Sequence, residues 1–373
     1  GLVLALALVE LLLPAFSAFL QYPITFSYVS DWPLLLGLVG VAVIAGLVSG
    51  FYPALVLSGF RPAATLRANS AGRTGSGLFR NVLVELQFAV SIGLGIAAAV
   101  VFAQIQYDRT IDLGFGHNNI LVVSQGRLNI EQRAAFDHAL RNYPGIISVG
   151  QSDRIPFQTG QSLGVVRVPG NPQDITMNSI GIDPYYSKVY GIALVAGREL
   201  SENRASDQMH SNMPQPDPLN NGKNILVNVA GAHRLGFTPQ QAVGQIVKLN
   251  GADTHIVGVL ADAKVQGARA PVTPDYYFYV PSDSRTFSVL LRPDMIPQTL
   301  AFIDKTWKDF SPQFAVQRNF LDDSYNQFYS ADQREGTMFA IFVGIAIFIA
   351  CLGLFGLAAF TAGRRTKEIG IRK

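Results

Sequence analysis

The chain has 373 residues, of which 49% are hydrophobic and only 15% are charged, and its formal net charge is +3. Soluble globular chains carry about 25% charged residues, so this deficit favours a membrane protein, and the small net charge argues against nucleic-acid binding. Cys351 is the single cysteine, which excludes an intrachain disulfide. Because apolar sequence begins directly at Gly1, we expect this sequence to belong to a longer protein.

Four apolar blocks are long enough to cross a membrane, for which a helix needs roughly 20 residues. In chain order they cover residues 1–20, 33–57, about 82–105 and 337–362. Buried core helices are the alternative interpretation, but runs of this length with so few charges favour membrane spans. Four spans leave the long, more polar segment 107–336 as a water-exposed domain.

Basic residues in the short connections predict the orientation of the spans. Residues 58–80 contain arginines and no acidic residue, and the tail 363–373 is also strongly basic. Both segments are therefore predicted to be cytoplasmic. Since four spans alternate consistently with this assignment, the domain 107–336 is predicted to lie outside the cytoplasm.

Small residues recur along two of the predicted membrane helices. Gly46 and Gly50 form a G-x-x-x-G pattern, and Ala89, Gly93 and Ala97 place a small residue at every fourth position. Such spacing lets helix backbones approach closely in lipid, although glycine and alanine are common in membrane helices in any case. The central turns carry no paired acidic or basic side chains, so a channel or a secondary transporter is not favoured.

The outer domain shows two β-α-β patterns separated by a long insertion. The first covers about 119–152 and the second about 286–319, each with an amphipathic helix between apolar strands, the last strand being predicted at 314–318. This arrangement predicts a ferredoxin-like part, and the insertion, about 155–285, is rich in strands and turns. The predicted fold class is thus membrane α-helical plus an α+β extracytoplasmic domain.

Two further segments of the domain have distinct compositions. Residues 202–223 are polar and rich in proline and asparagine, which is typical of a mobile excursion. A helix predicted for 320–335 leads directly into the last apolar block, with Gly336 between them. A helix that continues from the domain into the membrane would transmit force stiffly.

A search for catalytic motifs identifies no enzyme. Gly160 to Gly164 match the G-x-S-x-G pattern of a hydrolase nucleophile, but strand-like sequence follows where that motif needs a helix. The five histidines are too scattered for a metal motif, and no phosphate-binding loop of the G-x-x-x-x-G-K-[ST] type occurs. We therefore expect any ATP hydrolysis to be carried out by another chain, with no cofactor in this one.

Several stretches together resemble the MacB/FtsX-like permeases of ABC transporters, in the subgroup with two consecutive permease modules. The stretch ACLGLFGLAAFTAGRRTKEIGIRK is similar to a second-module helix followed by a cytoplasmic elbow, and SGFYPALVLSGFRPAATLR to the end of a first module. The stretches GIDPYYSKVYGIALVAGREL, ILVNVAGAHRLGF, AVGQIVKLNG and IVGVLAD resemble the periplasmic core domain of that family. The resemblance covers essentially the whole chain.

The resemblance implies a domain organisation. Residues 1–57 would be the last two helices of a first module, 58–80 a cytoplasmic connection, and 81–106 the first helix of the second module. Residues 107–336 would be the periplasmic core domain, 337–362 a transmembrane helix and 363–373 the coupling elbow. The location implied is the bacterial inner membrane.

The resemblance also implies a mechanism in which a cytoplasmic ABC ATPase moves the permease helices, and these change the shape of the periplasmic domain. Its output would be export or extraction of a peptide, lipoprotein, lipid or drug. The expected partners are the ATPase, membrane lipid and a second permease module in a dimer or pseudo-dimer, with a periplasmic adaptor as a further candidate. The alternative functions are a membrane-anchored sensor and a regulator of cell-wall hydrolases.

The basic tail is the candidate site for coupling to the ATPase. A cluster that merely fixes topology needs no apolar residues, yet two isoleucines lie among its charges. With the family resemblance, the tail is predicted to dock on the ATPase through Arg364, Arg365, Lys367, Glu368, Ile369, Gly370, Ile371 and Arg372.

Overall fold

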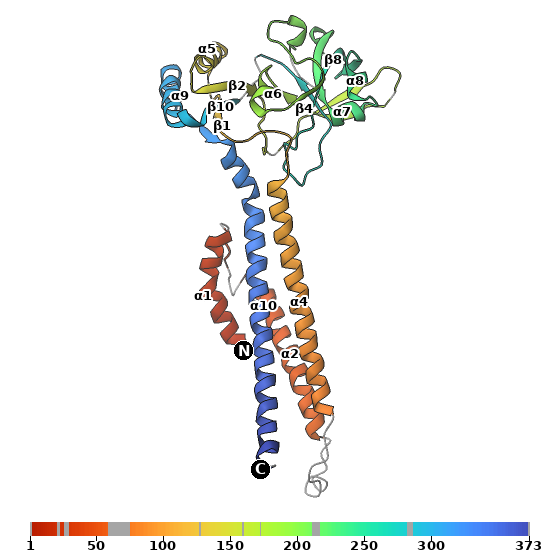
Figure 1. Cartoon of the computed structure of the whole chain (residues 1–373), viewed down its shortest axis with the longest axis vertical. Helices are drawn as coiled ribbons and strands as arrows, with labels where there is room; N and C mark the ends of the chain where they lie inside the picture. The colour runs from red at the N-terminus through yellow and green to blue at the C-terminus, as the bar shows by residue number, and fades with distance from the viewer. Residues whose placement is uncertain are drawn as a thin grey trace. The chain divides into compact units, whose positions relative to one another are not determined.

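The computed structural model describes residues 2–20, 23–25, 30–58, 75–126, 128–158, 160–171, 173–210, 217–281 and 286–371. The chain divides into two compact units. One comprises residues 1–102 and 332–373 and contains the apolar helices, and the other, Ala103–Ala331, is the α+β domain (Figure 1).

The first unit is built from long apolar helices. Its elements are α1 (Leu2–Leu20), α2 (Trp32–Ser58) and the greater parts of α4 (Gly75–Thr110) and α10 (Leu321–Ile371). Among the described residues, three stretches have the length and composition of a membrane span: Leu2–Leu20, Glu85–Asp108 and Leu321–Gly356. The expected span at 33–57 lies in α2, where the apolar stretch found is the shorter Trp32–Leu47.

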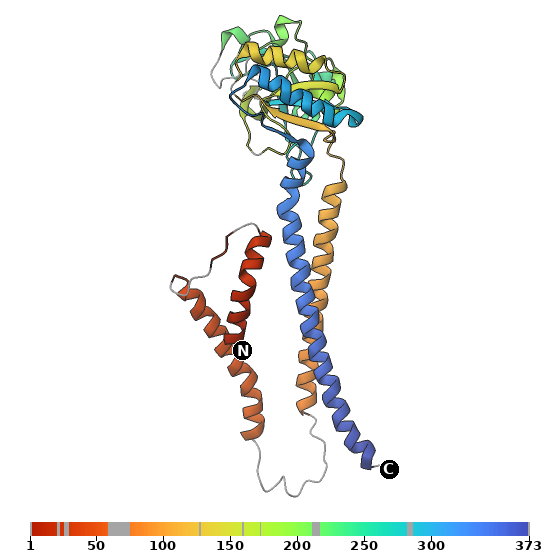
Figure 2. The ribbon, with the colours of Figure 1, turned by 90° about the vertical axis from the view of Figure 1, so that its left-hand side faces the viewer.

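Helices α4 and α10 run side by side in both views (Figure 1 and Figure 2). Small side chains let them approach, since Ser91 of α4 and Ala350 of α10 are buried. A Cβ added at Gly353 of α10 would lie 2.8 Å from Oε1 of Gln87 on α4. Close contact between the two helices therefore depends on residues that lack bulk.

The domain contains the predicted ferredoxin-like part. Strand β1 (Ile120–Ser124), helix α5 (Ile130–Arg141) and strand β2 (Ile146–Ser152) form the first half. Strand β10 (Thr286–Leu291), helix α9 (Ile296–Phe310) and strand β11 (Arg318–Phe320) form the second. Within the described residues the sheet order is β11-β1-β10-β2 with every pair antiparallel, which is the split β-α-β topology.

Local sequence explains where these elements begin and what they bury. Asn129 and Gln132 form a capping box, in which each side chain accepts a hydrogen bond from the other's backbone N–H, so α5 begins at Ile130. Helices α5 and α9 then lie together on one face of the sheet (Figure 2). Phe136 of α5 contacts Phe287 of β10 and Trp307 of α9 edge-on, with ring centroids 5.3 and 5.5 Å apart.

The last strand of this sheet begins later than predicted. The sequence predicts a strand at 314–318, but β11 starts only at Arg318. The backbone oxygen of Phe314 instead accepts a hydrogen bond from Nε1 of Trp307 at 2.9 Å, and the Phe314 side chain is exposed. The indole hydrogen bond thus replaces strand pairing at this residue.

The insertion forms a second sheet of seven described strands in the order β5-β8-β6-β9-β4-β3-β7. An additional pairing between β7 and β8 closes six of these strands into a ring, with the short β5 attached to β8. The strands and short helices are β3 (Leu163–Arg167), β4 (Ile175–Gly181), α6 (Tyr186–Tyr190), β5 (Leu194–Gly197), β6 (Lys223–Asn228), α7 (Val229–Arg234), α8 (Pro239–Ala242), β7 (Ile246–Leu249), β8 (Ala252–Leu260) and β9 (Asp275–Phe278).

A hydrophobic cluster joins the two parts of the domain to the start of α10. It combines Val122 of β1, Tyr190 of α6 and Leu260 of β8 with Leu321 and Tyr329 of α10. The buried hydroxyl groups of Tyr190 and Ser288 are 2.8 Å apart, so each satisfies the other's hydrogen bonding. The domain core is therefore continuous with the first turns of the helix.

The described parts of the polar excursion 202–223 make specific contacts with the rest of the insertion, and its mobility stays a prediction. Asp207, in the short helix η1 (Ala205–Asp207), is fully buried and accepts hydrogen bonds from both terminal nitrogens of Arg198, at 2.7 and 2.9 Å. Burial would raise the pKa of Asp207, but the bonds from Arg198 and from Asn224 lower it below its usual value. Residues 211–216 lie outside the described residues.

Candidate functional site

The two long helices end within the same compact unit as the domain, and one loop of the insertion contacts both. This segment, residues 261–274, connects β8 to β9 and is called the junction loop below. The residues that surround it come from the last turns of α4 and the first turns of α10. It is the candidate functional site because it lies where movement of a helix would reach the domain.

The contact with α4 is an ion pair at a buried carboxylate. Nε of Arg269 in the junction loop donates to Oδ2 of Asp108 at 2.5 Å, and the Asp108 side chain is only 4% exposed. Nε2 of Gln104, one turn earlier in α4, donates to the other carboxylate oxygen at 3.0 Å. Because a buried carboxylate is costly without a partner, Asp108 holds the loop firmly to the helix end.

The contact with α10 combines a hydrogen bond with close packing. The backbone N–H of Ala268 donates to the hydroxyl oxygen of Tyr329 at 2.8 Å, and that N–H is buried. Gly267 has a φ of +93°, and a Cβ there would lie 2.6 Å from the ring of Phe328. Only glycine combines this backbone conformation with such an approach, so the loop fits directly against the helix.

An aromatic cluster extends this contact toward the segment that follows α4. Phe157, whose φ is +66°, has its ring 5.6 Å from that of Phe115 and 5.3 Å from that of Tyr325 on α10. Its backbone N–H donates to the oxygen of Val265 in the junction loop at 2.8 Å. A non-glycine residue with positive φ is strained, and here it is held by contacts on three sides.

A histidine completes the link between the two helix ends. Nδ1 of His117, in the segment after α4, lies 2.7 Å from Oδ1 of Asp322 in the first turn of α10. The His117 ring also stacks on that of Tyr325, with centroids 4.8 Å apart and planes 5° from parallel. His117 is partly exposed and joins segments that are far apart in the chain.

These contacts link the ends of both long helices to the insertion. In the part of the chain that the structure describes, no group of three or more His, Cys, Asp or Glu side chains could hold a metal ion. The G-x-S-x-G sequence at Gly160 to Gly164 runs into strand β3, so it does not form the strand-turn-helix of a nucleophile elbow.

The predicted coupling residues fall at the end of α10. Arg364, Arg365, Lys367, Glu368, Ile369, Gly370 and Ile371 are within this helix, while Arg372 lies outside the described residues. Residues 363–371 thus belong to the same uninterrupted helix of 51 residues that begins in the domain, and this helix passes through Gly336 without a break.

The predicted packing residues make no close approach to other described residues. Within the part of the chain that the structure describes, a Cβ added at Gly46, Gly50 or Gly93 would meet no atom within 4 Å, and Ala89 and Ala97 are exposed. The faces they occupy on α2 and α4 are thus available to other helices or lipid, and their role in packing stays a prediction. Among the described residues, Ser91 and Ala350 are buried and Gly353 lies close to Gln87, and the G-x-x-x-G pattern includes none of these three.

Sequence reasoning missed the junction loop itself. Asp108 and Arg269 are 161 positions apart, and no spacing in the sequence pairs them. The available signals were an acidic residue at the end of a predicted span and a glycine within a polar loop.

Apolar helices of membrane-spanning length that continue into an α+β domain define a membrane-anchored protein with a water-exposed domain. The chain belongs to the family of MacB-like periplasmic core domains, which matches residues 88–310, more than half of its length. It is therefore a MacB-like permease domain of the ABC type with membrane helices, and its domain lies on the extracytoplasmic side of the membrane. No curated protein matches the chain.

Several solved structures are similar to this chain. The periplasmic region of MacB from Actinobacillus actinomycetemcomitans is 17% identical, with a TM-score of 0.38 over 57% of this chain and 94% of that one. The extracellular domain of the noncanonic ABC-type transporter YknZ from Gram-positive bacteria is 17% identical, with a TM-score of 0.36 over 54% and 100%. A domain of a permease protein from Porphyromonas gingivalis is 15% identical, with a TM-score of 0.35 over 55% and 92%.

Proposed function

We propose that the chain is a permease subunit of an ABC transporter of the MacB/FtsX type. It relays the ATP-driven movement of a separate cytoplasmic ATPase to the periplasmic domain, for export or extraction of a peptide, lipoprotein, lipid or drug. The observation that carries the proposal is the junction loop, which binds the ends of both long helices and continues into the insertion.

The relay starts at the end of α10, where residues 363–371 would contact the ATPase. A continuous helix resists bending, so a displacement of these residues would reach Tyr329 with little loss. Tyr329 is bonded to Ala268, and Phe328 packs on Gly267, so the junction loop would move with the helix. Since the loop is joined to β8 and β9, the strand ring of the insertion would be displaced next.

Helix α4 supplies the reference against which α10 moves. Its last turn holds Arg269 through Asp108, and the segment that follows it holds the start of α10 through His117. A shift between the two helices would therefore strain the junction loop from both sides. In this scheme the chain needs no cofactor of its own, because the ATP is bound and hydrolysed on the partner subunit.

We assign the remaining segments accordingly. Residues 1–57 are the last helices of a first module, and 58–80 are a cytoplasmic connection, of which residues 59–74 lie outside the described residues. Residues 81–106 and 337–362 are the membrane helices that flank the domain. The exposed small faces of α2 and α4 would then pack against a second module in a dimer or pseudo-dimer.

The test uses the full-length protein, reconstituted in lipid nanodiscs with a co-expressed ABC ATPase. Spin labels are placed at Asn326 of α10 and Asn203 of the insertion in a Cys351→Ser background, and their separation is measured with and without ATP. We expect the ATPase to co-purify and ATP to change the distance distribution. An ATPase variant that binds but does not hydrolyse ATP is the control for the direction of the change.

Two outcomes would contradict the proposal. If no ATPase co-purifies and ATP leaves the distance unchanged, the permease assignment fails and the sensor alternative gains support. If ATP changes the distance but no substrate leaves the membrane or the periplasm, the same relay would serve regulation of cell-wall hydrolases instead of transport.

A further inference from the structure

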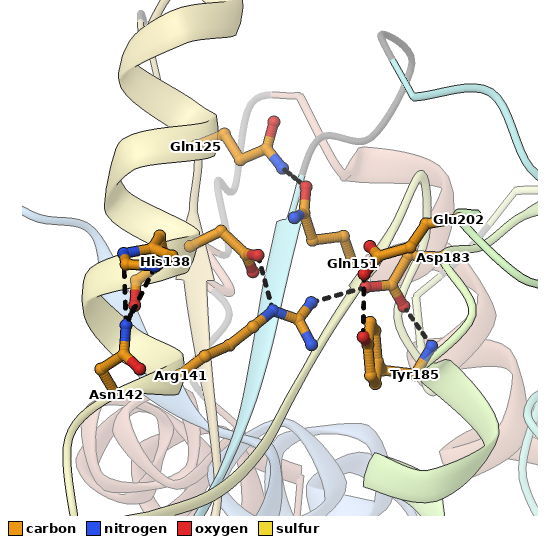
Figure 3. Close-up of polar contacts among 9 residues, drawn as sticks. Gln125, His138, Arg141, Asn142, Gln151, Asp183, Tyr185 and Glu202 are labelled. Carbon is orange, nitrogen blue, oxygen red and sulfur yellow. Dashed lines mark hydrogen bonds and ion pairs between the residues drawn. The ribbon is translucent and has the colours of Figure 1, made fainter.

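A polar cleft lies between helix α5 and the insertion, within the α+β domain (Figure 3). Its volume is about 380 Å³, in the range of small-ligand sites. One wall is a single face of α5, where Arg133, Asp137 and Arg141 follow one another at intervals of four residues. Glu202 and Tyr279 of the insertion form the opposite wall.

The positive charge of Arg141 is shared between two carboxylates. Its Nε donates to Oδ2 of Asp137 at 2.6 Å, and its Nη2 donates to Oδ2 of Asp183, on the floor of the cleft, at 3.1 Å. The guanidinium also lies 3.8 Å from the centroid of the Tyr185 ring. Figure 3 shows Arg141 at the centre of these contacts, so little of its charge is left for a ligand.

The carboxylates of the cleft keep unused capacity. Oδ1 of Asp137 is buried and, in the described part of the chain, accepts no hydrogen bond. Glu202, which lines the cleft, accepts a bond from the Tyr185 hydroxyl through Oε1, at 3.0 Å. Three carboxylates, those of Asp137, Asp183 and Glu202, thus face two guanidinium groups, and Nη1 of Arg133 is bonded to Gln125.

We propose that this cleft binds an organic cation, a guanidinium or a primary ammonium group, between Glu202 and the Asp183–Asp137 pair. Such a ligand would supply the positive charge that the cleft lacks and could donate to several carboxylate oxygens at once. A guanidinium offers a planar set of donors, so it suits carboxylates that lie on different walls. The Tyr279 ring would cover the methylene groups that carry the cation.

The ionisation of Asp183 supports this assignment. Its side chain is only 6% exposed, and burial raises its pKa to about 7, although the nearby Arg141 lowers it. A bound cation would favour the carboxylate form, so binding near pH 7 would release a proton and tighten as the pH rises. The charged and polar groups that face Asp183 are Arg141 and Asp137 of α5, Gln151 of β2, Tyr185 before α6, Glu202 after β5 and Tyr279 after β9.

The experiment measures binding of N-acetyl-L-arginine amide to the full chain in nanodiscs by isothermal titration calorimetry. N-acetyl-L-citrulline amide, which has nearly the same shape and no charge, is the control probe. We expect saturable binding of the arginine probe, several-fold tighter at pH 8 than at pH 6, and none of the citrulline probe. Titrations in buffers of different ionisation enthalpy should show proton release near pH 7.

Variants assign the effect to the cleft. Glu202→Gln should weaken binding at least tenfold, and Asp183→Asn should remove the pH dependence and the proton release. Asp253→Asn changes an exposed carboxylate paired with Lys248, away from the cleft, and should leave binding unchanged. Circular dichroism of each variant checks that the domain remains folded.

Three results would overturn the inference: equal binding of the citrulline probe, binding that Glu202→Gln does not change, or preferential binding of the anionic N-acetyl-L-glutamate amide. Because the measurement needs neither an ATPase nor ATP, its outcome is independent of the proposed function. A failed cation test would leave the relay through the junction loop untouched, and a failed relay would leave the cleft intact.

Discussion

The membrane helices expose their apolar side chains, whereas the α+β domain buries its own. In the helices, Ile44 and Phe355 leave 62% and 73% of their surface exposed, whereas in the domain Phe287 and Ile303 are completely buried. The domain therefore covers its own apolar surface, while the helices depend on lipid and other helices to cover theirs. From this difference we learn that the domain's fold follows from its own sequence, but the arrangement of the helices depends on their surroundings.

The largest effect is expected where the helix region meets its partner. Replacing an apolar residue of the elbow by a charged one, as in Ile369→Asp, should uncouple ATP hydrolysis from the domain and reduce the ATP-driven distance change more than tenfold. Glu368→Lys should act in the same way, and both proteins should still insert into the membrane. Ile369→Leu is the matched control, and an unchanged response in both charged variants would reduce the tail to a topological anchor.

A substitution in the domain core measures how much a buried apolar side chain stabilises the domain. Ile303→Ala removes a fully buried side chain and should cost about 2–5 kcal/mol in the free energy of unfolding of the domain. Ile345→Ala, at a residue of α10 that is 50% exposed, should cost less than about 1 kcal/mol. Fluorescence of Trp307 in a Trp32→Phe background reports on the domain, and equal losses for both variants would contradict the contrast.

The buried carboxylate of Asp183 makes the stability of the domain sensitive to pH. Its folded-state pKa of about 7 lies above its ordinary value of 3.8, so the domain is stabilised below about pH 4 and loses this contribution as the pH rises through 7. Asp183→Asn should remove this slope and raise the stability at pH 8 by up to about 4 kcal/mol. Denaturant titrations at pH 5 and pH 8 test this, and a slope retained in the variant would disprove the assignment.

The smallest effect is expected at the junction between the two regions. Gly267→Ala places a Cβ against Phe328, while Gly170→Ala, with a similar positive φ, meets no atom within 4 Å. Backbone strain should lower the free energy of unfolding of both variants by about 1–2 kcal/mol. The clash with Phe328 should lower that of Gly267→Ala by about 1–2 kcal/mol more. Hydrogen exchange at the Ala268 amide should accelerate only in the Gly267 variant. Equal exchange rates in the two variants would contradict a contact between the junction loop and α10 at Gly267.

The elements with strong periodicity could be predicted from the sequence. Both β-α-β halves and the helix that continues into the last apolar block are found close to the predicted positions, and the insertion is rich in strands as expected. The individual strands of the insertion have weaker patterns, and β4 and β9 even contain buried polar residues. Asn178 of β4 donates to Asp275 of β9 at 3.0 Å, so two buried polar groups satisfy each other across the sheet.

The site was harder to predict because it depends on contacts between distant segments. The basic elbow at 364–372 was visible in the sequence since charge beside a span is a local pattern, yet its docking role stays a prediction. The junction loop and the cleft bring together residues from α4, α5, α10 and the insertion, and no local periodicity marks them. Gly114, Phe157 and Gly267, which lie in or against the junction loop, have positive φ, and this conformational mark is visible only in three dimensions.

The pairing of β7 with β8 closes a ring of described strands, and this closure bears on how the domain avoids aggregation. A sheet that is repeatedly strained would normally expose backbone groups along its border, where a neighbouring chain can add a strand and start aggregation. Among the described strands of the ring, each has a partner on both sides, and the attached border strand β5 is only four residues long. If the insertion moves as we propose, its described strands would still offer little free border for fibre growth or strand exchange between copies.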